Sequence, residues 1–150
     1  MRGRPAVRRL RRAPAPSIAG LLALVALVTA CRSSEPATPL CYEQRGGQAE
    51  SPSIEQLRLD RAGDQISGFY RWIPWQKDRR IGTLSGRVSS AGTAQVDYRF
   101  SQEGQQARAP LTIVFDAQRA VIRWDQPQQP MPPVELPARA CAELTAVPDL

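Results

Sequence analysis

The sequence predicts an all-β protein, an antiparallel meander of six or seven strands that curls into a barrel or half-barrel. Three observations support this fold class. Apolar and polar residues alternate with a period of two in several short segments. Turn-forming residues separate these segments at intervals of about 12 residues. No segment of helical length after residue 31 has a helical period.

The expected strands follow one another along the chain. The first is expected over residues 41–45, and each later strand is marked by apolar or aromatic side chains. In chain order these markers are Leu57 and Leu59; Ile66, Gly68, Tyr70 and Trp72; Ile81, Leu84 and Val88; Val96, Tyr98 and Phe100; Leu111, Ile113 and Phe115; and residues 121–124.

Turn chemistry separates these strands. Short turns are expected at residues 61–64, 89–92, 103–106 and 116–118, with a longer loop at 74–80. Gly82 and Gly86 lie inside a strand, where glycine indicates a bulge or a close approach of another backbone.

A meander leaves two edge strands unpaired unless it curls or closes on itself. We therefore expect a lipocalin-like barrel or half-barrel. A flatter sandwich has the same alternation, so the pattern leaves it open as the alternative.

Two cysteines, Cys41 and Cys141, bracket the predicted β domain. In an exported protein such a pair predicts a disulfide that joins the two ends of the domain. Two free buried thiols are the alternative. Closing a loop of this length would contribute about 4.7 kcal/mol in the chain-entropy model.

Residues 126–137 contain five prolines and predict an extended, polyproline-like segment. We interpret this segment as a strap that returns the chain so that Cys141 can reach Cys41. A ligand for a proline-binding partner is the other interpretation.

The formal net charge of +6 comes from the start of the chain. Six arginines lie in the first 12 residues, and removing them leaves 14 basic residues against 14 acidic ones. Residues 31–150 therefore have no net charge, which argues against nucleic acid as a partner. Histidine is absent, so histidine triads and histidine metal sites are excluded.

Residues 1–30 have the pattern of a secretory signal, with an arginine cluster followed by the apolar run 18–30. As a helix, this run is about 20 Å long, shorter than a bilayer core of about 30 Å. The segment Leu27-Val28-Thr29-Ala30-Cys31 resembles the lipobox of bacterial lipoproteins. The resemblance implies that Cys31 receives a diacylglyceryl group and, after cleavage, becomes the acylated (palmitate-bearing) first residue. An ordinary cleavable signal with an incidental cysteine is the alternative.

The lipobox resemblance also implies a location. In a host with two membranes, aspartate after the lipidated cysteine retains such proteins at the inner membrane. Position 32 holds arginine, so in such a host we expect the outer membrane, facing the periplasm. Residues 31–40 form the lipidated start and flexible tether. Residues 41–145 form a single β domain that includes the proline-rich strap, and residues 146–150 form a tail.

The domain resembles a group of small β-rich bacterial lipoproteins whose function is not established. The resemblance covers roughly residues 41–115 and depends on the order of its short motifs. These are Cys41-Tyr42, Tyr70 to Trp72, Lys77-Asp78, Gly82-Thr83, Gly86, Tyr98, Phe100 and Glu103-Gly104. It implies a β-rich lipoprotein and no activity.

The loop from Trp72 to Arg80 is the best candidate for a binding site, because tryptophan and arginine are frequent at interfaces and stack on ligands. The alternative is that Trp72 belongs to the core and the charged residues form a solvated turn. Glu103 and Asp78 would make a paired-carboxylate site only if their loops met. The full set of candidate binding residues is Tyr70, Trp72, Trp75, Lys77, Asp78, Arg79, Tyr98, Glu103 and Trp124.

These observations predict a non-enzymatic cell-envelope lipoprotein that presents a binding surface near a membrane. No catalytic residue, cofactor or metal site is expected: the serines lack a nucleophile elbow, residues 82–86 lack the lysine of a phosphate-binding loop, and the cysteines lack metal spacing. We expect a small apolar ligand at the barrel mouth. The alternative is a protein-binding module, either an envelope assembly factor or an inhibitor of a wall-degrading enzyme.

Overall fold

The computed structural model describes residues 38–48, 50–89, 92–128 and 130–147, so the predicted signal and lipidation site lie outside the described residues. Eight β-strands are followed by a short 3-10 helix, Cys141–Glu143. The strands are β1 (Leu40–Gln48), β2 (Ser51–Ala62), β3 (Gln65–Ile73), β4 (Arg80–Val88), β5 (Thr93–Gln102), β6 (Gln105–Phe115), β7 (Arg119–Trp124) and β8 (Val134–Arg139). No helix of the described residues is long and apolar enough to cross a membrane.

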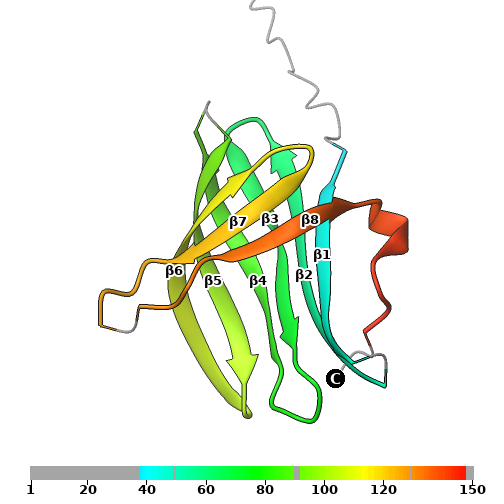
Figure 1. Ribbon diagram of the computed structural model, residues 1–150. Helices are drawn as coiled ribbons and strands as arrows, with labels where there is room; N and C mark the ends of the chain where they lie inside the picture. Colours follow the sequence, from blue (N-terminus) through cyan, green and yellow to red (C-terminus); the bar gives the residue numbers. More distant parts are fainter. Residues whose placement is uncertain (1–37, 49, 90–91, 129, 148–150) are drawn as a thin grey trace, which may run out of the picture. The chain divides into compact units, whose positions relative to one another are not determined.

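The strands form a closed antiparallel barrel in which each strand pairs with its neighbours in the sequence (Figure 1). Closure comes from β8, which pairs with β1 at Cys41↔Arg139 and Tyr42↔Ala138. The predicted all-β meander is thus confirmed, and of the predicted architectures the closed barrel is the one observed. Closure removes the free sheet edges that an open meander would expose.

The predicted count of six or seven strands is wrong, because the strap contains an eighth. The strap at 126–137 contains a turn at residues 127–128, and β8 begins inside it at Val134. The prolines concealed this strand, since proline lacks the N–H that a sheet requires. Pro137 is nevertheless accommodated in β8, opposite Arg119.

The barrel interior is filled by side chains that alternate along every strand, as the period of two predicts. The fully buried members include three tyrosines and aliphatic residues from β2 to β8. They are Tyr42, Tyr70, Tyr98, Leu57, Leu59, Leu111, Ile113, Ile122 and Leu136.

Gly82 and Gly86 are places where another strand approaches closely. A Cβ at Gly82 would overlap the carbonyl oxygen of Arg99, and one at Gly86 would overlap that of Gln95. The expectation of a close backbone approach at these glycines is therefore confirmed.

The predicted disulfide between Cys41 and Cys141 is confirmed, with the two Cα atoms 5.1 Å apart. The chain that follows it crosses the outer face of β1 and β2. There the Glu43 carboxylate accepts bonds from the Thr145 backbone N–H (2.7 Å) and hydroxyl (2.9 Å), from Gln56 (2.7 Å) and from Arg45 (2.7 Å). Burial raises the pKa of Glu43, but these hydrogen bonds outweigh burial and lower it to about 2.

Candidate functional site

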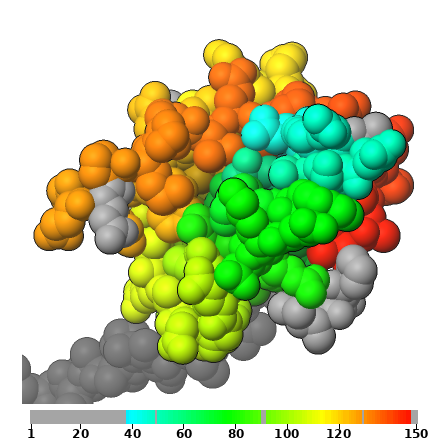
Figure 2. Space-filling view, turned by 60° about the horizontal axis from the view of Figure 1, so that its bottom comes forward, coloured from blue at the N-terminus to red at the C-terminus, as the bar shows by residue number. Residues whose placement is uncertain are grey.

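The two ends of the barrel differ. The disulfide end contains the start of β1, the turns that follow β2, β4 and β6, and the end of β8. The opposite end, called the mouth here, contains the β3–β4 loop (74–79), the β5–β6 turn (103–104) and the β7–β8 connection (125–133). Figure 2 brings the mouth forward, with the orange β7–β8 connection projecting at one side of the green β3–β4 segment.

A pocket of about 170 Å³ lies at the mouth. One side of the pocket comes from three adjacent strands and carries its two charged groups, Glu55 of β2 and Arg80 of β4. Both are paired with Trp72 of β3, which lies between them. The β7–β8 connection and the start of β8 supply an apolar side. The lining residues are Glu55, Tyr70, Trp72, Arg80, Met131 and Val134.

Arg80 is the cation of this pocket. Its guanidinium carbon lies 4.6 Å from the ring centroid of Trp124, 5.3 Å from that of Phe100 and 5.4 Å from that of Trp72. Its Nε donates to Gln102 Oε1 at 2.8 Å. Among the described residues no carboxylate forms an ion pair with Arg80, and its two terminal nitrogens have no hydrogen-bond acceptor. Aromatic faces thus hold the cation in place while its terminal donors stay uncommitted.

Packed aromatic rings form a floor beneath Arg80. Tyr98 stacks on Phe100 with centroids 4.8 Å apart, and Trp124 meets both rings edge-on at 5.9 Å. The Tyr98 hydroxyl donates to the Tyr70 carbonyl at 2.8 Å. These contacts fix the rings, so the floor is part of the core.

Glu55 is the carboxylate of the pocket and is 8% exposed. It accepts a hydrogen bond from the Tyr70 hydroxyl and another from Gln44 Nε2 at 3.2 Å. Burial raises the pKa of Glu55, and these bonds and the charge of Arg80 offset the shift only in part. Burial also raises the pKa of Tyr70, and the neighbouring Glu55 adds to that shift.

Trp124 carries an unpaired donor. Its side chain is 9% exposed, and its indole Nε1 has no hydrogen-bond partner within the described part of the chain. Like the terminal nitrogens of Arg80, this N–H is a donor without an acceptor among the described residues.

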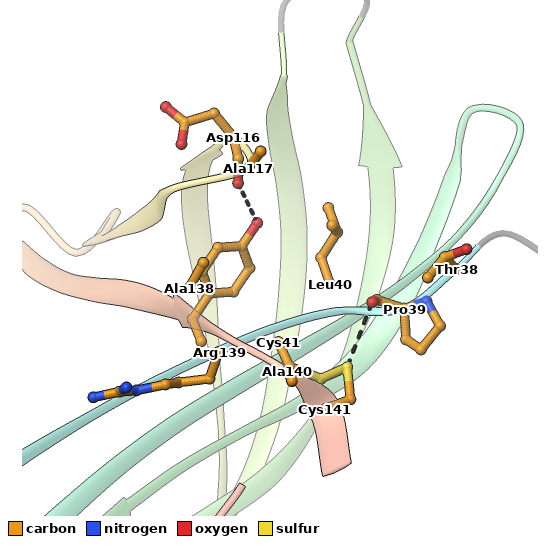
Figure 3. A pocket seen from close by; sticks show the side chains of 11 residues that line it. Thr38, Pro39, Leu40, Cys41, Asp116, Ala117, Ala138, Arg139, Ala140 and Cys141 are labelled. Carbon is orange, nitrogen blue, oxygen red and sulfur yellow. Dashed lines mark hydrogen bonds between the residues drawn. A yellow bond between two sulfur atoms is a disulfide. The ribbon is translucent and has the colours of Figure 1, made fainter. Parts of the chain in front are cut away.

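A second hollow, of about 330 Å³, lies at the disulfide end beside Cys41 and Cys141 (Figure 3). Backbone and small side chains form most of it, and the Tyr42 hydroxyl there already donates to the Asp116 carbonyl at 2.7 Å. Burial, with the charge of Asp116, raises the pKa of Tyr42 to about 12. The charged residues that line this hollow are Asp116, whose carboxylate accepts from the backbone N–H groups of Gln118 and Arg119, and the exposed Arg139.

The structure brings some of the predicted binding residues together and separates others. Tyr70 and Trp72 line the pocket, while Tyr98 and Trp124 lie in its floor and not in its wall. Trp75 is 49% exposed on the β3–β4 loop. Lys77 and Asp78 are exposed on the same loop and Arg79 is half-buried. Glu103 is exposed in the β5–β6 turn, and no hydrogen bond joins it to Asp78.

The pocket has two charged groups, Glu55 and Arg80. Glu55 was not among the predicted residues, and Arg80 was predicted only as the last residue of the candidate binding loop. The alternation contained the signal for both. One further step of two from Leu57 reaches Glu55, and one from Gly82 reaches Arg80, so each occupies an inward position. Charged residues are mostly exposed, so Glu55 and Arg80 were not expected to point into the barrel. Met131 and Val134 were missed because their contribution depends on where the proline-rich connection runs.

Comparison with known proteins found no matching protein-family model, no matching curated protein and no matching solved structure. Among the described residues no group of three or more His, Cys, Asp or Glu could hold a metal ion. The pocket at the mouth thus offers a ligand three kinds of group: the cation of Arg80 held by aromatic rings, the buried carboxyl group of Glu55 and an apolar wall.

Proposed function

We propose that this chain is a non-enzymatic, lipid-anchored protein of the cell envelope whose barrel binds a small ligand at its mouth. The observation that carries the ligand proposal is the pocket of about 170 Å³ with a mainly aromatic and aliphatic lining. An apolar cavity of about 150 Å³ accepts a molecule the size of benzene. The barrel below is filled, so the ligand enters the mouth only.

The lipobox-like segment that ends at Cys31 supports the anchor part of the proposal. Acyl chains at Cys31 would hold the protein at the membrane, since two or more chains give stable anchoring.

The ligand proposal is tested by filling the pocket. Val134→Phe places a ring in the pocket, whereas Val114→Phe makes the same change at an exposed position of β6 that is 38% exposed. We expect calorimetry to detect binding of benzamide, a small neutral aromatic, to the wild-type chain and to Val114→Phe. Val134→Phe should lose it. Equal binding by all three chains, or none by the wild type, would contradict the proposal.

The anchor is tested separately by the intact mass of the protein from membranes. We expect the mass of residues 31–150 plus acyl chains, and no acylation after Cys31→Ser. An unacylated wild-type mass would refute the anchor and leave the pocket proposal standing.

A protein partner is the second candidate function, favoured by the exposure of Trp75 beside Lys77 and Asp78. Exposed tryptophan is enriched among residues that dominate binding energy at interfaces. Under this alternative, replacing Trp75 and Arg79 with alanine abolishes capture of an envelope partner. Unchanged capture would exclude it.

A further inference from the structure

The mouth contains more hydrogen-bond donors than its own acceptors satisfy. The two oxygens of Glu55 are occupied by Tyr70 and Gln44, whereas the terminal nitrogens of Arg80 have no acceptor among the described residues. The Trp124 indole N–H beneath them is also unpaired there. The buried Trp124 N–H costs free energy because it has no acceptor. Arg80 is half-buried, so water can reach its terminal nitrogens. A ligand with carboxylate oxygens would replace that water with charge-assisted hydrogen bonds to Arg80.

The orientation of Arg80 narrows the ligand chemistry. Its guanidinium lies against three aromatic rings, closest to Trp124 at 4.6 Å. A guanidinium that lies over aromatic rings keeps its N–H edge free, and that edge matches the two oxygens of a carboxylate. The lining beside it, Trp72, Met131 and Val134, is suited to an apolar body.

We infer that the mouth pocket binds a small amphipathic carboxylate, with Arg80 pairing with its negative group and the aromatic and aliphatic wall covering its apolar body. This inference rests on the proposed ligand-binding function. The volume of about 170 Å³ limits the enclosed part to roughly the size of a substituted benzene ring. Any longer portion would extend over the rim, where Met131 is 40% exposed.

Three probes of nearly equal shape separate charge from size. Benzoate is an anion, benzamide is neutral and benzamidinium is a cation. We expect calorimetry on the full chain at pH 7 to give affinity in that order, with benzoate about tenfold or more tighter than benzamide, the ratio that one charge-assisted hydrogen bond supplies. The indole N–H signals of Trp72 and Trp124 should shift in NMR spectra with benzoate.

Variants test whether Arg80 causes the preference for benzoate over benzamide. Arg80→Gln should bind benzoate and benzamide equally, and Arg80→Lys should restore part of the difference. Arg87→Gln is the matched control, because Arg87 lies on the same strand at the disulfide end, in an exposed ion pair with Asp64. It should behave as wild type.

The outcomes separate this inference from the proposed function. Equal affinity of benzoate and benzamide for the wild type would overturn the carboxylate assignment while the pocket stands. Tightest binding of benzamidinium would overturn it in favour of Glu55 as the recognising group. No binding of any probe would refute the pocket proposal itself. The wild-type series decides these points even if Arg80→Gln fails to fold.

Discussion

The two ends of the barrel are built from different chemistry. At the disulfide end the interior is mainly aliphatic, with Ile66, Val88 and Ile113 buried, and the buried Tyr42 bonds the Asp116 carbonyl. Backbone bonds there join neighbouring turns, such as Val88 N–H to the Asp64 carbonyl at 2.8 Å. At the mouth, the interior holds Glu55 and Arg80 among aromatic rings. The disulfide end is thus closed by ordinary core packing, whereas the mouth is not. Charged groups inside the mouth are costly for stability, which supports the role in binding that we propose.

Removing the disulfide should cause the largest loss of stability of the changes considered. It acts at the end of the barrel opposite the mouth, so ligand binding should be affected least. We expect Cys141→Ser to lower the free energy of unfolding by about 4–5 kcal/mol, since the bridge spans 100 residues. Urea titration would measure the loss, with the reduced wild type as the control. At low temperature benzamide binding should persist. Loss of binding in a still-folded variant would show that the two ends are coupled.

A core truncation at the disulfide end tests whether aliphatic packing carries the stability. Ile113 is fully buried on β6, so Ile113→Ala should cost about 2–5 kcal/mol. Val114→Ala, next to it and pointing outward, should change the free energy of unfolding by less than about 0.5 kcal/mol. Similar effects of both changes in urea titrations would contradict the assigned register.

The contrast between the ends also explains how far the sequence could predict this molecule. The strands and turns follow from a period of two and from turn residues such as Glu103-Gly104, which are local signals. The eighth strand was missed because Pro137 argues locally against a strand, whereas its pairing with β1 and β7 is set by closure. Arg80 was predicted only as the end of the candidate loop, because a charged residue at an inward position becomes understandable only once Trp72, Phe100 and Trp124 surround it.

The carboxylate outside the barrel should stabilise the fold at neutral pH. Glu43 is 2% exposed and its pKa is lowered to about 2, below the ordinary value of 4.5. Its contribution is therefore present above about pH 4.5 and is lost as the pH falls toward about 2. Glu43→Gln should cost about 1.5–3 kcal/mol at pH 7. Urea titrations of both chains should converge at low pH, and a difference that grows on acidification would contradict this account.

The carboxyl group inside the mouth should behave in the opposite way. Burial raises the pKa of Glu55 above its ordinary value of 4.5, so the unfolded chain gives up this proton more readily than the folded one. The wild type should then lose stability as the pH rises from about 4.5 to the raised value, and stay level above it. Glu55→Gln keeps an acceptor for Tyr70 and removes this loss. Above that window we expect Glu55→Gln to unfold at an equal or higher urea concentration than wild type, the smallest of the four effects. A variant less stable than wild type above the window would show that the ionised carboxylate stabilises the mouth, and that Arg80 is committed to Glu55 instead of to a ligand.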